Sequence, residues 1–323
     1  MSDPPAITIQ SVREASERLK GAAHATPVLT SAALDAAGGR RFFFKCENFQ
    51  RTGAFKFRGA WNAVARLAES GYRGTVLTHS SGNHAQALAL AARLHGMTAI
   101  VVMPAGASRA KREAVAGYGA AIVECGPTMA DREAVLERER QRSGAALVPP
   151  FDHADVIAGQ GTACLDLLAA HPDLDAVIAP VGGGGLISGT ALVAGSAARP
   201  VRVFAGEPAM ADDAARSKAA GAIQPQRPPV TIADGLRGPL GLLTWPFVRD
   251  RVERIVTVPE DEIVAAMRLV WERMKIVIEP SAAVPVAAVL SKEFRAMGGI
   301  ERVGVILSGG NVDLDALPWT QGR

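Results

Sequence analysis

Lys56 stands between Phe55 and Phe57, at the point where an amphipathic helix is expected to begin. An amine that aromatic neighbours withdraw from water holds its proton less tightly, because burial disfavours the ammonium form. A lysine whose pKa is lowered in this way can act as a nucleophile and as a base. A solvent-exposed lysine at a helix start has the same local pattern, so Lys56 alone leaves both interpretations open.

Four consecutive glycines, Gly182 to Gly185, follow the apolar segment 176–181 and lead into a helical segment. Backbone N–H groups at such a helix start converge on one point and bind anions, phosphate in particular. A dinucleotide-binding loop needs glycine at positions i, i+2 and i+5, and no glycine of this run begins such a pattern. A Walker loop needs a lysine at the position that Thr190 occupies here. We therefore expect a phosphate that belongs to neither a dinucleotide nor a nucleoside triphosphate; a flexible linker is the alternative.

Polar groups also follow two other strand-like segments. Ser308 ends the apolar segment 302–307, where its hydroxyl can bond a ring nitrogen or simply cap a turn. A polar turn follows segment 75–79, and it has more polar groups than a helix N-cap requires. This turn, which we expect to receive a substrate carboxylate, consists of Ser80, Ser81, Gly82, Asn83 and His84.

The segments that carry these residues are short apolar strands alternating with helices, over 75–151 and again over 176–307. Strands that are apolar throughout are covered on both faces, which is typical of parallel sheets, and ligands bind beyond the carboxyl ends of such strands. We expect an α/β fold with two open, mostly parallel twisted sheets flanked by helices. Residues 1–73 and 148–323 are expected to form a large domain, and 74–147 a small domain closing over the site. Segment 221–235 is expected to be an ordered surface excursion.

Composition excludes several other classes of protein. The 323 residues are 48% hydrophobic and 21% charged, as in ordinary globular proteins. The net charge of +3 comes without a basic patch, so we expect neither nucleic acid nor a membrane as partner. Cys46, Cys125 and Cys164 form no disulfide framework or zinc pattern, and no signal peptide or membrane span is seen, which favours a cytoplasmic protein.

A phosphate loop, an activated lysine, a serine for a ring nitrogen and a carboxylate-binding turn together suit pyridoxal phosphate. The chain resembles the fold-type II pyridoxal-phosphate enzymes of the tryptophan synthase β-like fold. Within them it is similar to the branch of serine racemase, threonine dehydratase and threo-3-hydroxyaspartate ammonia-lyase. The segments that carry this resemblance are FKCENFQRTGAFKFRGA, THSSGNHAQALALAA, IAGQGT, PVGGGGLISG, GEPAMADDA, TIADG, WERMKIVIEPSAAV and LSGGNVDL.

The resemblance implies pyridoxal 5'-phosphate as cofactor, with Lys56 as the lysine that forms the imine. It also implies a divalent cation (Mg²⁺, Ca²⁺ or Mn²⁺) held by Glu207, the carbonyl of Ala211 and Asp213; acids that merely lie near a helix start are the alternative. The other residues implied to contact the cofactor are Phe55 on the ring, Asn83 at the phenolic oxygen, Gly182, Gly183, Gly184, Gly185 and Leu186 at the phosphate, Glu279 as an acid, and Ser308 at the pyridine nitrogen.

The expected reaction is β-elimination of water from a β-hydroxy amino acid, which makes the protein an ammonia-lyase. Arg132 matches an arginine at the edge of the site and can pair with a second carboxylate, and PPFDHADVIAGQGT is closer to the hydroxyaspartate type. We therefore favour 3-hydroxyaspartate, with serine and threonine possible; Arg132 in solvent is the alternative. Ser81 matches the serine that acts opposite the lysine in racemases, so a serine racemase with dehydratase activity stays open.

Two further expectations concern assembly and a different class of function. Homodimers are usual in the resembled branch, so a homodimer is expected. A nucleotide-binding oxidoreductase, with Glu207 on a ribose, is the alternative from another class, and the failed glycine spacing argues against it.

Overall fold

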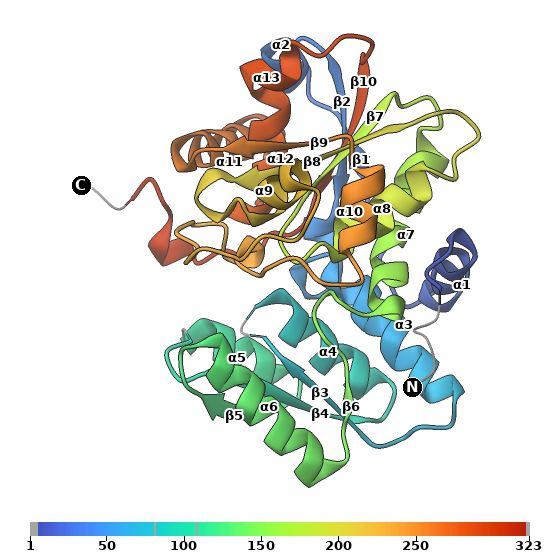
Figure 1. Cartoon of the computed structure of the whole chain (residues 1–323), viewed down its shortest axis with the longest axis vertical. Helices are drawn as coiled ribbons and strands as arrows, with labels where there is room; N and C mark the ends of the chain where they lie inside the picture. Colours follow the sequence, from blue (N-terminus) through green and yellow to red (C-terminus); the bar gives the residue numbers. More distant parts are fainter. Residues whose placement is uncertain (1–5, 81, 108, 321–323) are drawn as a thin grey trace.

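The computed structural model describes residues 6–80, 82–107 and 109–320 and contains two open sheets, one above the other in Figure 1. The six-stranded sheet has the order β1-β2-β10-β7-β8-β9 and is parallel except for the β1–β2 pair. The four-stranded sheet, β5-β4-β3-β6, is parallel throughout. The α/β class with two mostly parallel sheets is thus confirmed. The strands are β1 (Val28–Leu29), β2 (Arg41–Cys46), β3 (Thr75–His79), β4 (Thr98–Pro104), β5 (Ala121–Cys125), β6 (Ala146–Leu147), β7 (Ala176–Pro180), β8 (Arg202–Pro208), β9 (Arg254–Val258) and β10 (Arg302–Leu307).

Helices cover both faces of the six-stranded sheet. Successive side chains of a strand point to opposite faces, so Phe42 and Phe44 join one core while Phe43 joins the other. The strands therefore need apolar residues at every position, as their sequences have. The first core contains α2 (Ala32–Gly38), α11 (Glu260–Met274), α12 (Pro280–Leu290) and α13 (Lys292–Arg295); the second contains α1 (Ile9–Leu19), α7 (Ala154–Ala170), α8 (Gly185–Ala194) and α10 (Trp245–Arg251).

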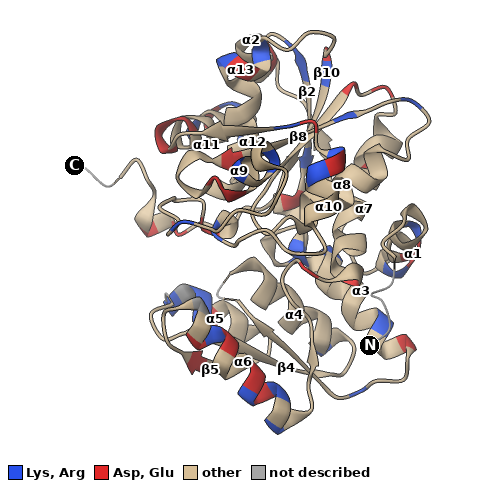
Figure 2. Ribbon diagram, in the orientation of Figure 1, with Lys and Arg blue, Asp and Glu red and all other residues tan. Residues whose placement is uncertain are grey.

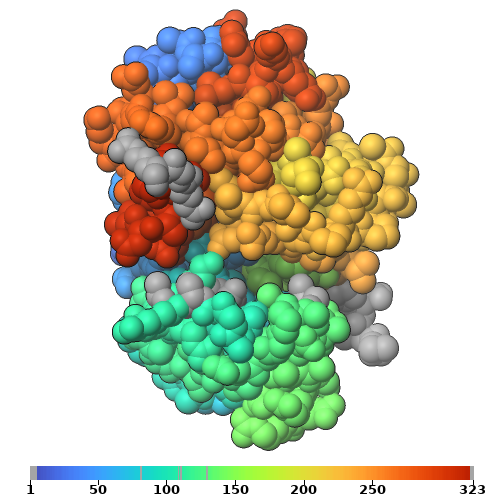
Figure 3. Space-filling view, turned by 90° about the vertical axis from the view of Figure 1, so that its left-hand side faces the viewer, coloured from blue at the N-terminus to red at the C-terminus, as the bar shows by residue number. Residues whose placement is uncertain are grey.

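The four-stranded sheet is covered by its own helices. One face packs on α3 (Lys56–Glu69), α4 (Asn83–Leu94) and α5 (Arg109–Gly117), and the other on α6 (Met129–Ser143). In the space-filling view, residues 75–147 form the lower lobe of the molecule (Figure 3). Lys and Arg are interspersed with Asp and Glu over both parts (Figure 2).

Helix α3 connects the two parts, because it packs against α4 on one side and α7 on the other. Arg58, one turn into this helix, is buried and forms ion pairs with Glu47 at 2.7 Å and Asp166 at 2.9 Å. The two carboxylates raise the pKa of Arg58 despite its burial, so its charge is retained. This network holds the start of α3, and hence Lys56, in a defined place.

Some local features differ from the expected pattern. The segment 146–151 pairs as a strand only at Ala146–Leu147, because Pro149 and Pro150 have no N–H to donate. Segment 221–235 lacks regular structure up to the short turn η4 (Asp234–Leu236), as expected of an excursion.

Within the described ranges, no helix is both long and apolar enough to cross a membrane. The remaining elements are α9 (Asp213–Ala220), η1 (Glu47–Phe49), η2 (Arg51–Gly53), η3 (Ala209–Ala211) and η5 (Leu314–Ala316).

Candidate active site

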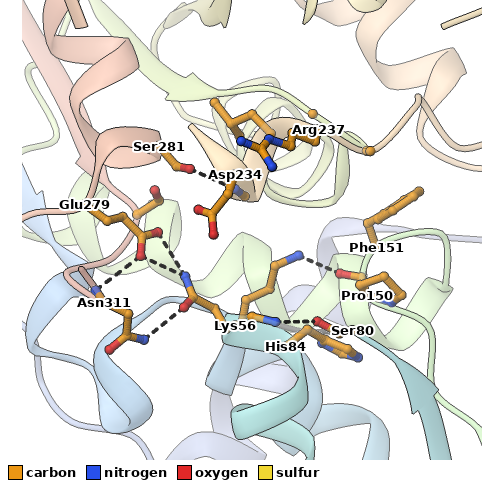
Figure 4. Close-up of a pocket in the computed structure, with 18 of the residues that line it drawn as sticks. Lys56, Ser80, His84, Pro150, Phe151, Asp234, Arg237, Glu279, Ser281 and Asn311 are labelled. Carbon is orange, nitrogen blue, oxygen red and sulfur yellow. Dashed lines mark hydrogen bonds between the residues drawn. The ribbon is translucent and has the colours of Figure 1, made fainter. Parts of the chain in front are cut away.

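A cavity of about 470 Å³ opens between the two sheets, at the carboxyl ends of β3, β7 and β10 (Figure 4). Its volume lies in the usual range for small-ligand sites. Every residue expected to bind cofactor or substrate lines this one cavity, with the exception of Ser81, which lies outside the described residues. The lining set is Phe55, Lys56, Ser80, Gly82, Asn83, His84, Arg132, Gly182, Gly183, Gly184, Gly185, Leu186, Glu279 and Ser308.

Lys56 is the first residue of α3, and its side chain points into the cavity (Figure 4). Its Nζ donates a hydrogen bond to the carbonyl of Pro150 at 2.7 Å and lies 5.0 Å from the centre of the Phe55 ring. Burial lowers the pKa of Lys56 to about 8, against the opposing attraction of Glu279. Near pH 7, the neutral and nucleophilic fraction of the Lys56 amine is therefore much larger than that of a surface lysine.

Ser308 lies beside Lys56 because the backbone joins the two segments. The Phe55 N–H donates to the Ser308 carbonyl at 2.9 Å, and Ala54 forms a β-bridge with Gly309. Ser308 is 2% exposed, follows β10 directly and lines the cavity. The Ser308 hydroxyl, which is neutral and can both donate and accept a hydrogen bond, thus belongs to the segment that pairs with the start of α3.

The glycine run forms a tight loop between β7 and α8. Gly184 is the N-cap of α8 with φ +89°, a left-handed conformation that favours glycine. A Cβ at Gly183 would lie 2.4 Å from the Phe151 ring, so this position has no room for a side chain. The first N–H groups of α8 have no partner within the helix and line the cavity, which suits an anion such as phosphate.

Asn83, Glu279 and Asn311 form a hydrogen-bonded group that joins the two parts of the protein (Figure 4). The Asn83 amide donates to both oxygens of Glu279, at 2.9 and 3.1 Å, and its own oxygen accepts from the Asn311 amide at 2.9 Å. The Asn311 N–H also donates to Glu279, at 3.2 Å. Burial, followed by the charge of Asp234, raises the pKa of Glu279 to about 8, so this acid holds a proton near neutral pH.

The turn before α4 presents main-chain donors to the cavity. Gly82 is the N-cap of α4, and its N–H donates to the Ser80 hydroxyl at 3.2 Å. His84 is buried, and its Nε2 lies 2.9 Å from the Val148 carbonyl, to which it donates in the matching tautomer. Burial, and then the charge of Lys56, lower the pKa of His84 to about 3. The neutral ring leaves Nδ1 as an acceptor, so a carboxylate bound here would depend on N–H groups of the helix start and the Ser80 hydroxyl.

Arg132 reaches the cavity from α6, in the part built on the four-stranded sheet. Its Nε is buried and has no hydrogen-bond partner, and no described carboxylate lies within ion-pairing distance of its guanidinium. A cationic group with unused, partly buried donors at the edge of a cavity is suited to bind a carboxylate.

Glu207, Ala211 and Asp213 are all buried, and they lie away from the cavity lining. Glu207 accepts the N–H groups of Ala214 and Ala215 at 2.9 and 2.8 Å, so it also caps α9. Burial raises the pKa of Asp213, and it raises that of Glu207 to about 8. No cluster of three His, Cys, Asp or Glu suited to a metal occurs in the described part of the chain, and the expected cation ligands stay a prediction.

Several residues of the cavity carried no signal in the sequence. The Pro150 carbonyl and the Phe151 ring come from a loop that is far from Lys56 in the chain. Lys111 of α5 forms an ion pair with Asp234 of η4, which links the two parts across the cavity. Arg237 follows η4 and also lines the cavity. Only the segment PPFDHADVIAGQGT indicated a role for the Pro150 loop, and it did so by its resemblance to known enzymes.

The cavity fits pyridoxal phosphate by its own chemistry. A buried amine of lowered pKa, a helix start without room for side chains, and the buried Ser308 occur around one space. The sequence model of the family described as pyridoxal-phosphate dependent enzyme matches residues 19–309 of this chain. The chain belongs to the pyridoxal-phosphate dependent enzyme family.

Two relatives in this family are similar over nearly their whole length. A serine racemase of Dictyostelium discoideum is 46% identical over 313 residues, which cover 96% of this chain and 97% of the relative. A beta-hydroxyaspartate dehydratase of Paracoccus denitrificans (strain Pd 1222) is 49% identical over 312 residues, which cover 97% of this chain and 98% of the relative. The solved structure of maize serine racemase superposes with a TM-score of 0.95 at 46% identity, and 98% of this chain and 97% of that chain are covered. The expected family is therefore confirmed, and the oxidoreductase alternative is not supported.

Proposed function

We propose that this enzyme is an ammonia-lyase that removes water from 3-hydroxyaspartate to give oxaloacetate and ammonia. Arg132 is the observation that supports this substrate, because its cationic group lines the cavity of Lys56 without a carboxylate partner. A dehydratase of β-hydroxyaspartate among the relatives, at 49% identity, agrees with it. Serine and threonine have no second carboxylate, so they would leave this charge unused.

In the proposed reaction, the protein binds the substrate and moves one proton. Bound pyridoxal phosphate supplies a conjugated ring that stabilises negative charge at the substrate Cα. The amine of Lys56, once free, takes the α-proton and returns it to the β-hydroxyl, which leaves as water. The resulting enamine hydrolyses to the 2-oxo acid and ammonia. Main-chain N–H groups at the start of α4 hold the α-carboxylate, as proposed for the turn Ser80–His84.

Other residues are proposed to hold the cofactor. The N–H groups at Gly182–Leu186, which line the cavity, would bind its phosphate, and the Ser308 hydroxyl would bind the pyridine nitrogen. A hydroxyl does not keep that nitrogen protonated as a carboxylate would, which favours prompt loss of the β-hydroxyl over transamination. Phe55 would contact the ring, and Asn83 with Glu279 would lie at its phenolic oxygen.

The test is a substrate panel read by ammonia release and by enantiomer interconversion. It contains the four hydroxyaspartate isomers, serine and threonine. Arg132→Gln is expected to lower kcat/KM for hydroxyaspartate by about 10- to 100-fold relative to serine, since a charge-assisted hydrogen bond is lost. Arg138→Gln, on the exposed side of the same helix, is the matched control and leaves this ratio unchanged. Equal losses on both substrates for Arg132→Gln would contradict the proposal.

Serine racemisation is the second candidate, and the racemase relatives at 46% identity favour it. Ser81 is the residue on which it depends, and this residue lies outside the described part of the chain. Ser81→Ala is expected to abolish interconversion of serine enantiomers while elimination from L-substrates continues. Parallel loss of both activities would show that Ser81 has no separate role in racemisation.

We also propose a divalent cation at Glu207, Ala211 and Asp213. The two carboxylates are buried without a lysine or arginine within ion-pairing distance among the described residues, and a cation would compensate their charge. Mg²⁺, Ca²⁺ and Mn²⁺ all suit these oxygen ligands. Finally, the parts 1–73 with 148–323 and 74–147 are proposed to act as domains that close over the cavity, in a homodimer.

A further inference from the structure

Arg237 lines the same cavity as Arg132, but from the other part of the molecule. It follows η4 in the part built on the six-stranded sheet, whereas Arg132 comes from α6 in the other part. The two arginines therefore line the cavity that contains Lys56 from different parts of the molecule. Figure 4 shows the Arg237 side chain beside Asp234, above the lysine.

The position of Arg237 is determined by hydrogen bonds at both of its ends. Its Nε and Nη2 donate to the Thr231 carbonyl, at 3.1 and 2.5 Å. Its own carbonyl accepts from the Gln226 side chain at 2.8 Å. A guanidinium has five N–H donors, so these contacts orient the group and leave donors for a ligand.

Arg237 forms no ion pair with a described carboxylate. Asp234 is the nearest acid in sequence, but its ion pair is with Lys111, and no described carboxylate lies within ion-pairing distance of Arg237. Glu279, another acid of the lining, is proton-bound near neutral pH. Arg237 is thus a cationic group of the cavity lining that no described ion pair engages.

We propose that Arg237 binds the second carboxylate of a dicarboxylic substrate together with Arg132, and so determines specificity for that substrate class. The inference rests on the proposed function, which it extends by a residue with no signal in the sequence. A carboxylate has two oxygens, and one arginine from each part can donate to it. A substrate that bridges the two parts also favours their closed arrangement, whereas serine offers no such bridge.

Two measurements test this on the holoenzyme with Arg237→Gln. The first is the ratio of kcat/KM for hydroxyaspartate to that for serine, which is expected to fall about 10- to 100-fold. The second is inhibitor binding: the affinity for succinate falls by a similar factor, while that for butyrate, a monocarboxylate of the same length, stays within about twofold. Arg227→Gln, an exposed arginine of the same excursion that does not line the cavity, leaves both unchanged.

Further variants separate specificity from folding and from cofactor binding. Arg237→Lys keeps the charge and is expected to recover part of the succinate affinity, with an unchanged Tm. Equal loss for succinate and butyrate, or weakened binding of pyridoxal phosphate itself, would overturn the proposal, because Arg237 would then have a structural or phosphate-binding role. Failure of the proposed function is distinguishable: the wild type would not consume hydroxyaspartate, yet succinate binding would still depend on Arg237.

Discussion

Glu279→Gln is the substitution for which the structure gives the most specific expectation. The carboxyl of Glu279 is buried at the N-cap of α12, where burial and the charge of Asp234 raise its pKa to about 8. In the unfolded chain its pKa returns to about 4.3. Between these values the folded protein binds one more proton than the unfolded chain, so its stability falls as the pH rises.

The size of this effect follows from the shift in pKa. One unit corresponds to about 1.4 kcal/mol, so burial of Glu279 costs roughly 3 kcal/mol more at pH 8.5 than at pH 5.5. Glutamine has nearly the same shape, accepts from Asn83 as the protonated acid does, and cannot ionise. Between these two pH values, the unfolding free energy of Glu279→Gln is therefore expected to increase by that amount relative to that of the wild type.

The assay is urea unfolding of the apoenzyme at several pH values across this range. Glu262→Gln, an exposed glutamate at the start of α11, is the control, and its difference from the wild type should not vary with pH. A flat difference for Glu279→Gln as well would refute the reasoning. It would mean that Glu279 has an ordinary pKa in the folded protein and does not hold a proton beside Asn83.

Three other substitutions test the cofactor site and its support. Lys56→Ala should give a colourless protein, whereas the wild type should be yellow and should be bleached by borohydride; a yellow variant would exclude an imine at this position. Gly183→Ala should weaken cofactor binding at least 10-fold in a spectroscopic titration, because its Cβ would lie 2.4 Å from the Phe151 ring, and unchanged affinity would contradict the tight loop. Arg58→Met should destabilise the protein by about 3–5 kcal/mol, because Glu47 would stay buried without its partner; thermal unfolding measures this, and a change below about 1 kcal/mol would show that the network does not hold α3.

The sequence alone predicted which residues line the cavity, because several of them lie in recognisable local patterns. Lys56 between two phenylalanines, the four glycines before α8 and Ser308 after β10 are signals within a few residues. Parallel strands present their carboxyl ends at one edge of a sheet, so residues after several strands meet there although they are distant in the chain. Apolar residues at every strand position likewise predicted sheets covered on both faces.

Only the tertiary structure decided which groups face these residues across the cavity. Pro150 accepts from Lys56 across 94 positions, Lys111 pairs with Asp234 across 123, and Asn83 donates to Glu279 across 196. A carbonyl, or an arginine in an excursion such as Arg237, has no characteristic sequence pattern. Its role depends on how the two parts pack around α3, and burial in that arrangement is also what moves the pKa values of Lys56 and Glu279 toward neutrality.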